Sequence, residues 1–415
     1  MKTAIRIRLS LMMFLEYVIW GAWLPLLTIY LTQYLHFKGG SDFTPVQAAW
    51  IMNTFAISSI FAMFVGGQLA DRVFSVERYL AFSHLVGGVT MLLLPMQTSF
   101  LPFFIIMLIH CLFYVPTLSL ANSICFANLK DPKGEFGLVR LWGTIGWIAA
   151  SWPFIFLLKD KSGEQMASAL TWIFIVPGIA SLLLAGFCLT LPHTPPVKEA
   201  KQKFAPFEVL KLLVVPSILI LFFVTYLDTL VIWCYFFWTA PFLKTLGIKE
   251  NWMMPIMSIG QIAEIGTMAV LGYALKRFGW RVVMTVGIAA QAARFAIYAI
   301  SNQNLAWLVI LSNIIHGVCY AFFFASVYIF VDEHFPKDAR TSAQSMFNFL
   351  ILGLGPLTAN PVWGWLGQEL GVKDGNLPAF SKLFIVPTAI ALVATIGLFV
   401  LFRPEKIAKN SQEQS

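Results

Sequence analysis

Long apolar blocks separated by short charged loops constrain this chain more than any other feature of its sequence. Of its 415 residues, 59% are hydrophobic and only 12% are charged, whereas soluble domains carry about 25% charged residues. A membrane-spanning helix needs about 20 apolar residues, and lipid forces the backbone to pair with itself in helices or a closed barrel. The sequence does not show the short alternating segments of a barrel, so it predicts membrane-spanning helices.

We predict an all-α membrane protein with twelve spanning helices. The basic residues Lys2, Arg6 and Arg8 precede the first block and resemble the start of a signal peptide. Because that block is too long and has no small-residue cleavage site, we interpret it as a retained helix. The predicted spans are Ser10–Tyr34, Val46–Ala70, Tyr79–Pro95, Phe103–Asn128, Gly137–Leu158, Met166–Leu191, Leu213–Leu243, Trp252–Leu275, Arg281–Ile300, Leu305–Val331, Thr341–Leu366 and Phe380–Phe402.

The distribution of Lys and Arg predicts the orientation, because cytoplasmic loops carry an excess of both residues. With both termini on one side of the membrane, the opposite loops hold few of the 28 basic residues: Lys38, Lys159, Lys161, Lys244, Lys249, Lys373 and Lys382. We therefore expect a multi-pass protein in the bilayer of a bacterial inner membrane, with both termini in the cytoplasm. The same asymmetry accounts for the net charge of +8, so we expect no nucleic-acid partner.

The cysteines and the loops give no sign of a cofactor. All the cysteines lie within predicted helices, without the spacing of a metal site or a disulfide framework: Cys111, Cys125, Cys188, Cys234 and Cys319. The sequence contains no Gly-x-x-x-x-Gly-Lys-Ser/Thr phosphate loop, which argues against ATP as an energy source within this chain. We expect no cofactor, no metal ion and no enzymatic activity.

The chain divides into two halves. Prolines and charges interrupt the apolar pattern after the sixth predicted helix, in the segment that begins Pro192-His-Thr-Pro-Pro196. We predict a six-helix bundle at 1–191, a cytoplasmic linker at 192–212, a second six-helix bundle at 213–402 and a cytoplasmic tail at 403–415. Matching motifs follow predicted helices 2 and 8 and precede predicted helices 5 and 11, at nearly the same separation, which indicates a duplicated half.

The motif after predicted helix 2, Gly67-Gln-Leu-Ala-Asp71-Arg72, resembles the loop signature of the major facilitator superfamily. Gly67 permits a close approach of helices, and Asp71 and Arg72 can pair with neighbouring helix ends as a latch in one conformation. Ordinary anchoring at the cytoplasmic surface, with Asp71 as a capping residue, is the alternative. We favour the latch. The second copy of the motif has Lys276 at the position of the aspartate.

Ionisable side chains inside spanning helices are costly and usually face a cavity or a partner. In this sequence they are Glu16, His84, His110, Arg140, Asp228, Glu264, Arg294 and His316. Helical spacing places three groups on shared faces: Arg140, Thr144 and Trp147; Gln261 and Glu264; His316 and Tyr320. Charged, amide and aromatic groups together suit a polar solute that contains a ring. A structural network between helices could use the same residue types.

Glu264 and Glu16 are the candidate proton carriers. A carboxyl in a low-dielectric cavity can bind and release a proton as its exposure changes. Alternatively, Glu16 is a permanently neutral acid that is hydrogen-bonded to a neighbouring helix. Arg294 needs a counter-charge, and we predict that Glu264 supplies it, for structure, for switching or for both. We expect His84 and His110 to be packed or hydrogen-bonded.

Motifs across nearly the whole chain resemble the nucleoside:proton symporter family of the major facilitator superfamily. The most specific are Arg140-Leu-Trp-Gly-Thr144-Ile-Gly146 and Ser258-Ile-Gly-Gln261-Ile-Ala-Glu264. The others are Trp20-Gly-Ala-Trp23, Tyr114-Val-Pro-Thr117, Leu191-Pro-His-Thr-Pro195, Arg294-Phe-Ala and Arg340-x-Ser-Ala-Gln344. The resemblance implies the major facilitator fold and proton-coupled import of nucleosides by alternating access. We expect the protein to act as a monomer.

The resemblance also implies a substrate site made of Arg140, Thr144, Trp147, Gln261 and Glu264. Predicted helices 7 and 10 depart from the family. Trp233 and Phe236 stand where the family has glutamine and asparagine, His316 replaces an aromatic residue, and Ala321 follows Tyr320 where characterised permeases carry aspartate. We include Trp233, Phe236, His316 and Tyr320 in the predicted site.

These departures remove groups that would hydrogen-bond a ribose or a base. A permease for another polar solute, such as a sugar or a modified nucleoside, is therefore the first alternative function. The second is a membrane sensor that transports nothing, or an enzyme with an intramembrane site. No soluble domain and no nucleophile–base pair in the sequence favours that second alternative.

Overall fold

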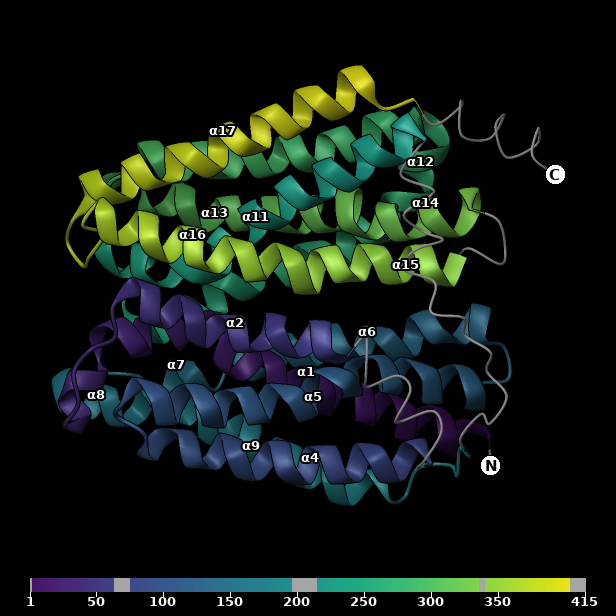
Figure 1. Cartoon of the computed structure of the whole chain (residues 1–415), viewed down its shortest axis with the longest axis horizontal. Helices are drawn as coiled ribbons and strands as arrows, with labels where there is room; N and C mark the ends of the chain where they lie inside the picture. The colour runs from purple at the N-terminus through teal and green to yellow at the C-terminus, as the bar shows by residue number, and fades with distance from the viewer. Residues whose placement is uncertain (1, 63–74, 196–214, 336–339, 404–415) are drawn as a thin grey trace. The chain divides into compact units, whose positions relative to one another are not determined.

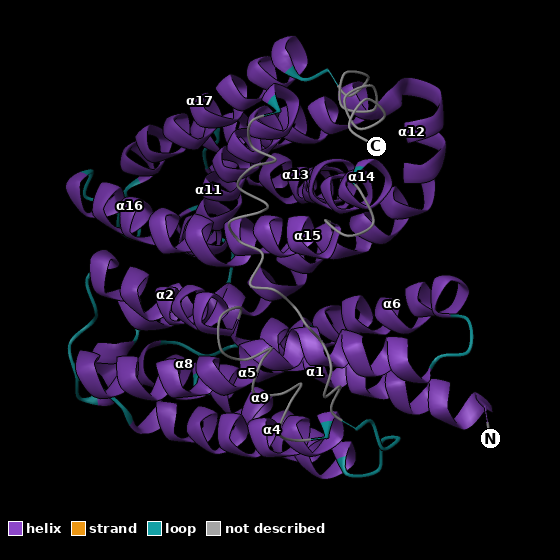
Figure 2. Cartoon of the chain, turned by 45° about the vertical axis from the view of Figure 1, so that its right-hand side comes forward, coloured by secondary structure: helices purple, strands orange, loops and turns teal. Residues whose placement is uncertain are grey.

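The computed structural model describes residues 2–62, 75–195, 215–335 and 340–403. Throughout these ranges the regular structure is helical, without a strand (Figure 2). Within them, nine helical segments are long and apolar enough to cross a membrane: Ala4–Gln33, Val76–Met96, Phe100–Asn128, Gly163–Cys188, Pro216–Thr245, Glu250–Ile300, Gln303–His334, Ala343–Glu369 and Leu377–Leu401. The all-helical prediction is confirmed, and the count of twelve spans stays a prediction.

The chain forms two compact units. The first comprises Met1–Ala200 with Lys249–Ser258, and the second comprises Lys201–Ile248 with Ile259–Ser415. In Figure 1 the colour runs from purple to teal along the first and from teal to yellow along the second.

In the first unit the long helices pack side by side. Helix α1 (Lys2–Gln33) packs against α6 (Pro132–Ser151) and α9 (Trp172–Cys188). Helix α5 (Phe100–Asn128) packs against α2 (Pro45–Phe61) and α4 (Val76–Leu93), and α4 also packs against α9 (Figure 1). The short helices of this unit are η1 (Leu35–Lys38), η3 (Leu94–Met96), α7 (Phe154–Leu157) and α8 (Gly163–Leu170).

In the second unit α11 (Pro216–Thr245) packs against α16 (Gly355–Glu369) and α17 (Leu377–Leu401). The predicted spans 252–275 and 281–300 are joined in α12 (Glu250–Ile300), which belongs to this unit from Ile259 onward. This helix is bent at Gly279, where φ is 76° and ψ is 167°. Positive φ costs a residue with a side chain much more than it costs glycine, so Gly279 suits this bend. The short helix η4 (Gln303–Leu305) follows α12.

Two predicted spans are interrupted by π-helical turns. The π-helix η5 (Tyr320–Ala325) lies between α13 (Ala306–Cys319) and α14 (Ser326–His334). A second π-helix, η6 (Phe349–Leu354), lies between α15 (Arg340–Asn348) and α16. A π turn adds a residue to the turn and rotates the helix face beyond it, and such turns are frequent at functional sites. Tyr320 of the predicted site begins one of them.

Candidate substrate and proton sites

Glycines bring α1 and α6 close together beside the Arg140 motif. A Cβ atom at Gly146 would lie 2.2 Å from the carbonyl oxygen of Phe14, and one at Gly21 would lie 3.0 Å from the Cα of Trp147. Side chains larger than hydrogen at these positions would push the two helices apart. Helix packing therefore explains Gly146 in the Arg140 motif and Gly21 in the Trp20-Gly-Ala-Trp23 motif, and it fixes the position of Trp147 against α1.

We expect Gly146→Ala to destabilise the protein by about 1–3 kcal/mol, because the added methyl group would overlap with backbone that has little room to move. Gly137→Ala is the matched control in the same helix, since a Cβ atom there meets nothing within 4 Å. The thermal unfolding of the two purified variants in one detergent provides the measurement. Equal melting temperatures would show that α1 and α6 are not packed as described.

A cation and several aromatic rings lie along the same part of α1 and α6. The guanidinium carbon of Arg140 is 4.1 Å from the centroid of the Tyr17 ring. Trp20 meets Trp147 edge to face, with 5.4 Å between the ring centroids, and stacks on Phe55 at 4.8 Å. Flat apolar surfaces beside a multiple hydrogen-bond donor can hold a planar polar ring by stacking and by bonds to its edge.

Glu16 of α1 lies in a buried polar cluster within the first unit. Its side chain is 0% exposed, its Oε1 atom accepts a 2.6 Å hydrogen bond from the Thr117 hydroxyl, and its Oε2 atom is 2.9 Å from His84 Nε2. The Tyr114 hydroxyl donates a 2.7 Å bond to the carbonyl oxygen of Glu16. These contacts join α1 to α4 and α5, and they match the alternative interpretation of Glu16 as an acid bonded to a neighbouring helix.

The two intramembrane histidines of the first unit are buried and engaged, as the sequence predicted. His110 Nδ1 lies 2.9 Å from the carbonyl oxygen of Gly87, and His84 Nδ1 lies 3.4 Å from the Ser181 hydroxyl. Sequence reasoning did not pair His84 with Glu16, because the two residues lie on helices that are not consecutive. The one signal in the sequence that could have suggested the contact is that both are ionisable side chains within spanning helices, and such side chains often pair with one another.

In the second unit, glycines bring α12 and α13 together beside the Gln261–Glu264 motif. A Cβ atom at Gly317 would lie 2.3 Å from the backbone nitrogen of Glu264, and one at Gly260 would lie 2.7 Å from His316 Cδ2. His316 therefore lies directly against the turn of α12 that carries Gln261. Gln261 is buried and Glu264 is partly exposed, so this part of the unit carries an amide, a carboxyl and an imidazole close together.

Arg294 of α12 is fully buried and holds His316 in place. Its Nη1 atom is 2.7 Å from His316 Nδ1, its Nη2 atom donates a 2.7 Å bond to Gln291 Oε1, and its guanidinium carbon is 4.2 Å from the Tyr235 ring centroid. A guanidinium group can only donate hydrogen bonds, so Nδ1 accepts and a neutral His316 carries its proton on Nε2. The pairing of Arg294 with Glu264 stays a prediction.

The predicted aromatic residues of α11 lie near this cluster. Phe236 meets His316 edge to face at 6.2 Å between ring centroids, and Trp233 is 5.9 Å from Phe236. Trp233 is 4% exposed, whereas Phe236 and Tyr320 are partly exposed. The second unit therefore gathers four predicted residues, Gln261, His316, Trp233 and Phe236, with Glu264 one turn along α12.

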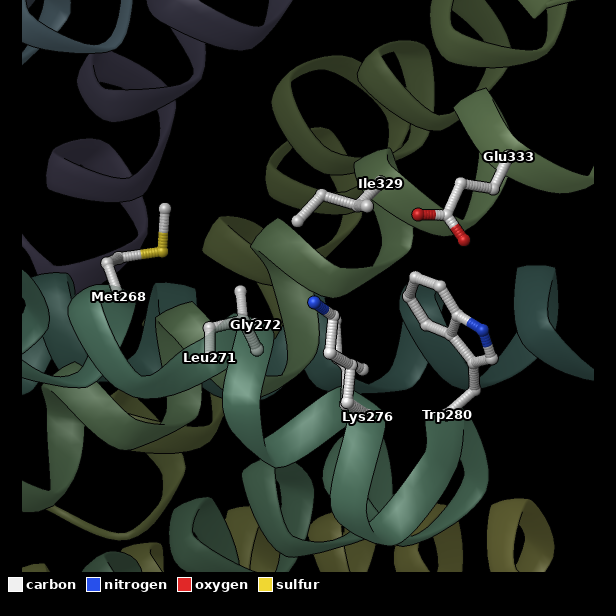
Figure 3. Close-up of a pocket in the computed structure, with 8 residues that line it drawn as sticks. Met268, Leu271, Gly272, Lys276, Trp280, Ile329 and Glu333 are labelled. Atoms are coloured by element: carbon white, nitrogen blue, oxygen red, sulfur yellow. The ribbon is translucent and has the colours of Figure 1, made fainter.

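A pocket of about 480 Å³ lies farther along α12, between that helix and α14. Figure 3 shows Lys276 and Trp280 on α12, with Glu333 opposite them on α14. The pocket is lined by Met268, Leu271, Gly272, Leu275, Lys276, Trp280, Ile329 and Glu333. Met268 lies one helical turn beyond Glu264, and none of the lining residues belongs to the predicted binding site. This pocket is separate from the predicted substrate groups.

The predicted latch and the metal-ligating side chains can be followed only as far as the described residues extend. The latch residues Gly67, Asp71 and Arg72 lie outside the described ranges. Over residues 2–62, 75–195, 215–335 and 340–403, no group of three or more His, Cys, Asp or Glu side chains could hold a metal ion. The five cysteines are buried and unbonded to one another.

Comparison with known proteins decides the family. The model of the nucleoside H⁺ symporter family matches residues 1–407. The chain belongs to this family. It is 32% identical to the putative nucleoside transporter YegT of Escherichia coli over 89% of this chain and 86% of that protein. It is 28% identical to the xanthosine permease of the same organism over 97% of this chain and 98% of that protein.

The fold is that of the major facilitator superfamily, as predicted. The crystal structure of the nucleoside transporter NupG matches with a TM-score of 0.82 and 25% identity, over 96% of this chain and 99% of that one. A D-xylose–proton symporter, at 14% identity, shares the fold alone, with a TM-score of 0.75. The relatives are transporters and not enzymes, so this chain is a multi-pass membrane transporter.

Proposed function

We propose that this protein imports nucleosides together with protons across a bacterial inner membrane, by alternating access between two six-helix halves. The family match over residues 1–407 carries the proposal. The chemistry of the two units supports it, because each unit presents hydrogen-bonding groups beside aromatic rings. A nucleoside combines a flat base, which stacks, with a ribose and base edges, which form hydrogen bonds.

In this proposal the first unit supplies Arg140, Thr144 and Trp147, and the second supplies Gln261 and Glu264. Arg140 and Gln261 bond polar edges of the substrate, and Trp147 stacks on its ring. Trp233, Phe236, His316 and Tyr320 complete the substrate contacts of the second unit. Glu264 carries the proton, and Glu16 is the alternative carrier. Arg294 supplies a positive charge that can balance the ionised carboxyl of Glu264.

A different polar solute, such as a sugar or a modified nucleoside, is the second candidate. The observation that favours it is the aromatic pair Trp233 and Phe236, which packs beside His316 and has fewer hydrogen-bonding groups than the family pattern implies. A site designed for hydrogen bonds discriminates strongly against a substrate that leaves its groups unpaired. The aromatic pair therefore predicts weaker selection for the ribose.

The decisive test is uptake of labelled uridine by the purified protein in proteoliposomes, with an inward proton gradient. We expect accumulation that collapses when a protonophore dissipates the gradient. Unlabelled purine and pyrimidine nucleosides should compete, and sugars should not. Competition by a sugar with no effect of nucleosides would support the second candidate and contradict nucleoside import.

The proposed topology can be tested with two single cysteines. Ser162 precedes α8 and Asp131 precedes α6, and both side chains are exposed. We expect an impermeant thiol reagent added from the periplasm to label Ser162→Cys and to leave Asp131→Cys unlabelled until the cells are opened. The native cysteines are buried, so the background should be low. Reversed labelling would place the termini in the periplasm.

A further inference from the structure

Asp228 of α11 is a buried carboxyl that the substrate and proton assignments do not use. Its side chain is 0% exposed, and neither Oδ1 nor Oδ2 has a hydrogen-bond partner among the described residues. Asp228 lies in the middle of Pro216–Thr245, a span with high apolar content. A carboxylate in such a place is costly, and residues of this kind inside spanning helices usually serve transport.

The polar neighbours of Asp228 on its own helix are already engaged. The Thr225 hydroxyl donates a 2.7 Å bond to the carbonyl oxygen of Leu221, and the Thr229 hydroxyl donates a 2.7 Å bond to that of Thr225. Both bonds are made within the helix, as is usual for threonine in a low-dielectric environment. Asp228 therefore receives no stabilisation from these hydroxyls.

The nearby charged and titratable groups of the other helices are Arg294 on α12 and Cys319 on α13. Both lie within Coulombic range of the Asp228 carboxyl. Arg294, however, directs its donors to His316 Nδ1 and Gln291 Oε1. The cation and the carboxyl thus occupy one buried region of the second unit without an ion pair between them within 4 Å.

A comparison with Glu16 shows how unusual this arrangement is. Both carboxyls are 0% exposed. The Thr117 hydroxyl bonds Glu16, and His84 lies 2.9 Å from it, so its charge can be neutralised by groups of the protein. Asp228 has no such donor among the described residues. The simplest way to neutralise Asp228 is a proton on the carboxyl itself.

We infer that Asp228 is a proton-binding carboxyl of the transport cycle, protonated in the conformation described here and deprotonated in a conformation that exposes it to water. Ionised Asp228 attracts Arg294, which would then release His316. Because His316 packs against the turn that carries Gln261, loss of the proton at Asp228 changes the shape of the substrate-binding face. This inference rests on the proposed proton-coupled transport and extends it to a residue on α11.

The test compares Asp228→Asn with Asp228→Glu. Asparagine imitates the protonated acid in size and breaks no hydrogen bond of the described structure, so the variant should fold. We expect it to exchange labelled for unlabelled uridine across the vesicle membrane but to lose accumulation driven by a pH gradient. Asp228→Glu keeps a titratable group and should retain accumulation. Glu369→Gln, an exposed carboxyl at the end of α16, is the control and should behave as wild type.

A second measurement reads the proton directly. Infrared spectra of the wild-type protein at neutral pH should contain the carbonyl-stretch absorption of buried protonated carboxylic acids, and Asp228→Asn should lose one component of it, whereas Glu16→Gln should keep that component. An unchanged band or unchanged accumulation in Asp228→Asn overturns the inference. If wild-type protein fails to exchange uridine at all, nucleoside transport itself is wrong, whereas the infrared band does not depend on the identity of the substrate.

Discussion

Arg140→Ala should weaken nucleoside binding by about 10- to 100-fold while the protein stays folded. A hydrogen bond to a charged group contributes about 1.5–3 kcal/mol, and each 1.4 kcal/mol changes the dissociation constant tenfold. Arg140 is held over the Tyr17 ring at 4.1 Å, so its donors are already oriented before a substrate arrives. Calorimetry or a binding assay with labelled uridine on detergent-purified protein provides the measurement.

Two variants make this result specific. Arg140→Lys keeps the positive charge but loses the planar pair of donors, so it should bind better than alanine and worse than arginine. Leu138→Ala changes a side chain that is 59% exposed on the same helix and should bind as wild type does. Wild-type affinity in Arg140→Ala, with a normal melting temperature, would remove Arg140 from the substrate site.

Glu264→Gln should uncouple transport from the proton gradient. Glu264 lies one helical turn from Gln261, so a solute held by the amide also reaches the carboxyl. Protonation of Glu264 and substrate binding are then linked, and such linkage is reciprocal. Glutamine imitates the protonated acid permanently. We expect full exchange of labelled for unlabelled uridine, with the accumulation ratio reduced to that of passive equilibration.

Glu16→Gln is the matched comparison from the first unit. A glutamine can still accept the bond from Thr117, so the buried cluster with His84 should persist and accumulation should continue. If the two outcomes are exchanged, Glu16 is the proton carrier and Glu264 is a ligand or a partner of Arg294. If both variants accumulate normally, these carboxyls are structural and coupling must lie elsewhere, for which Asp228→Asn is the next test.

Much of the fold could be predicted because membrane insertion is decided locally. The length and apolarity of each block reflect the thickness of the hydrocarbon layer, so helices could be placed from single stretches of sequence. The bend at Gly279 agrees with a boundary that the charged loop around it already indicated. The π turns at Tyr320–Ala325 and Phe349–Leu354 were missed, because hydrophobic periodicity does not report one extra residue in a turn.

The helical class of the fold, the family and the candidate binding residues on single helix faces could all be predicted from the amino-acid sequence. These properties depend on local composition, on spacing along one helix and on motifs within short segments. The packing of the helices was needed to find which residues meet across them: Gly146 with Phe14, Glu16 with His84, and Arg294 with His316. The packing was also needed to find that Asp228 is buried without a hydrogen-bond partner among the described residues. The reason is physical, since a hydrogen bond or a close contact depends on distances of about 3 Å, and those distances are set by how non-consecutive helices pack.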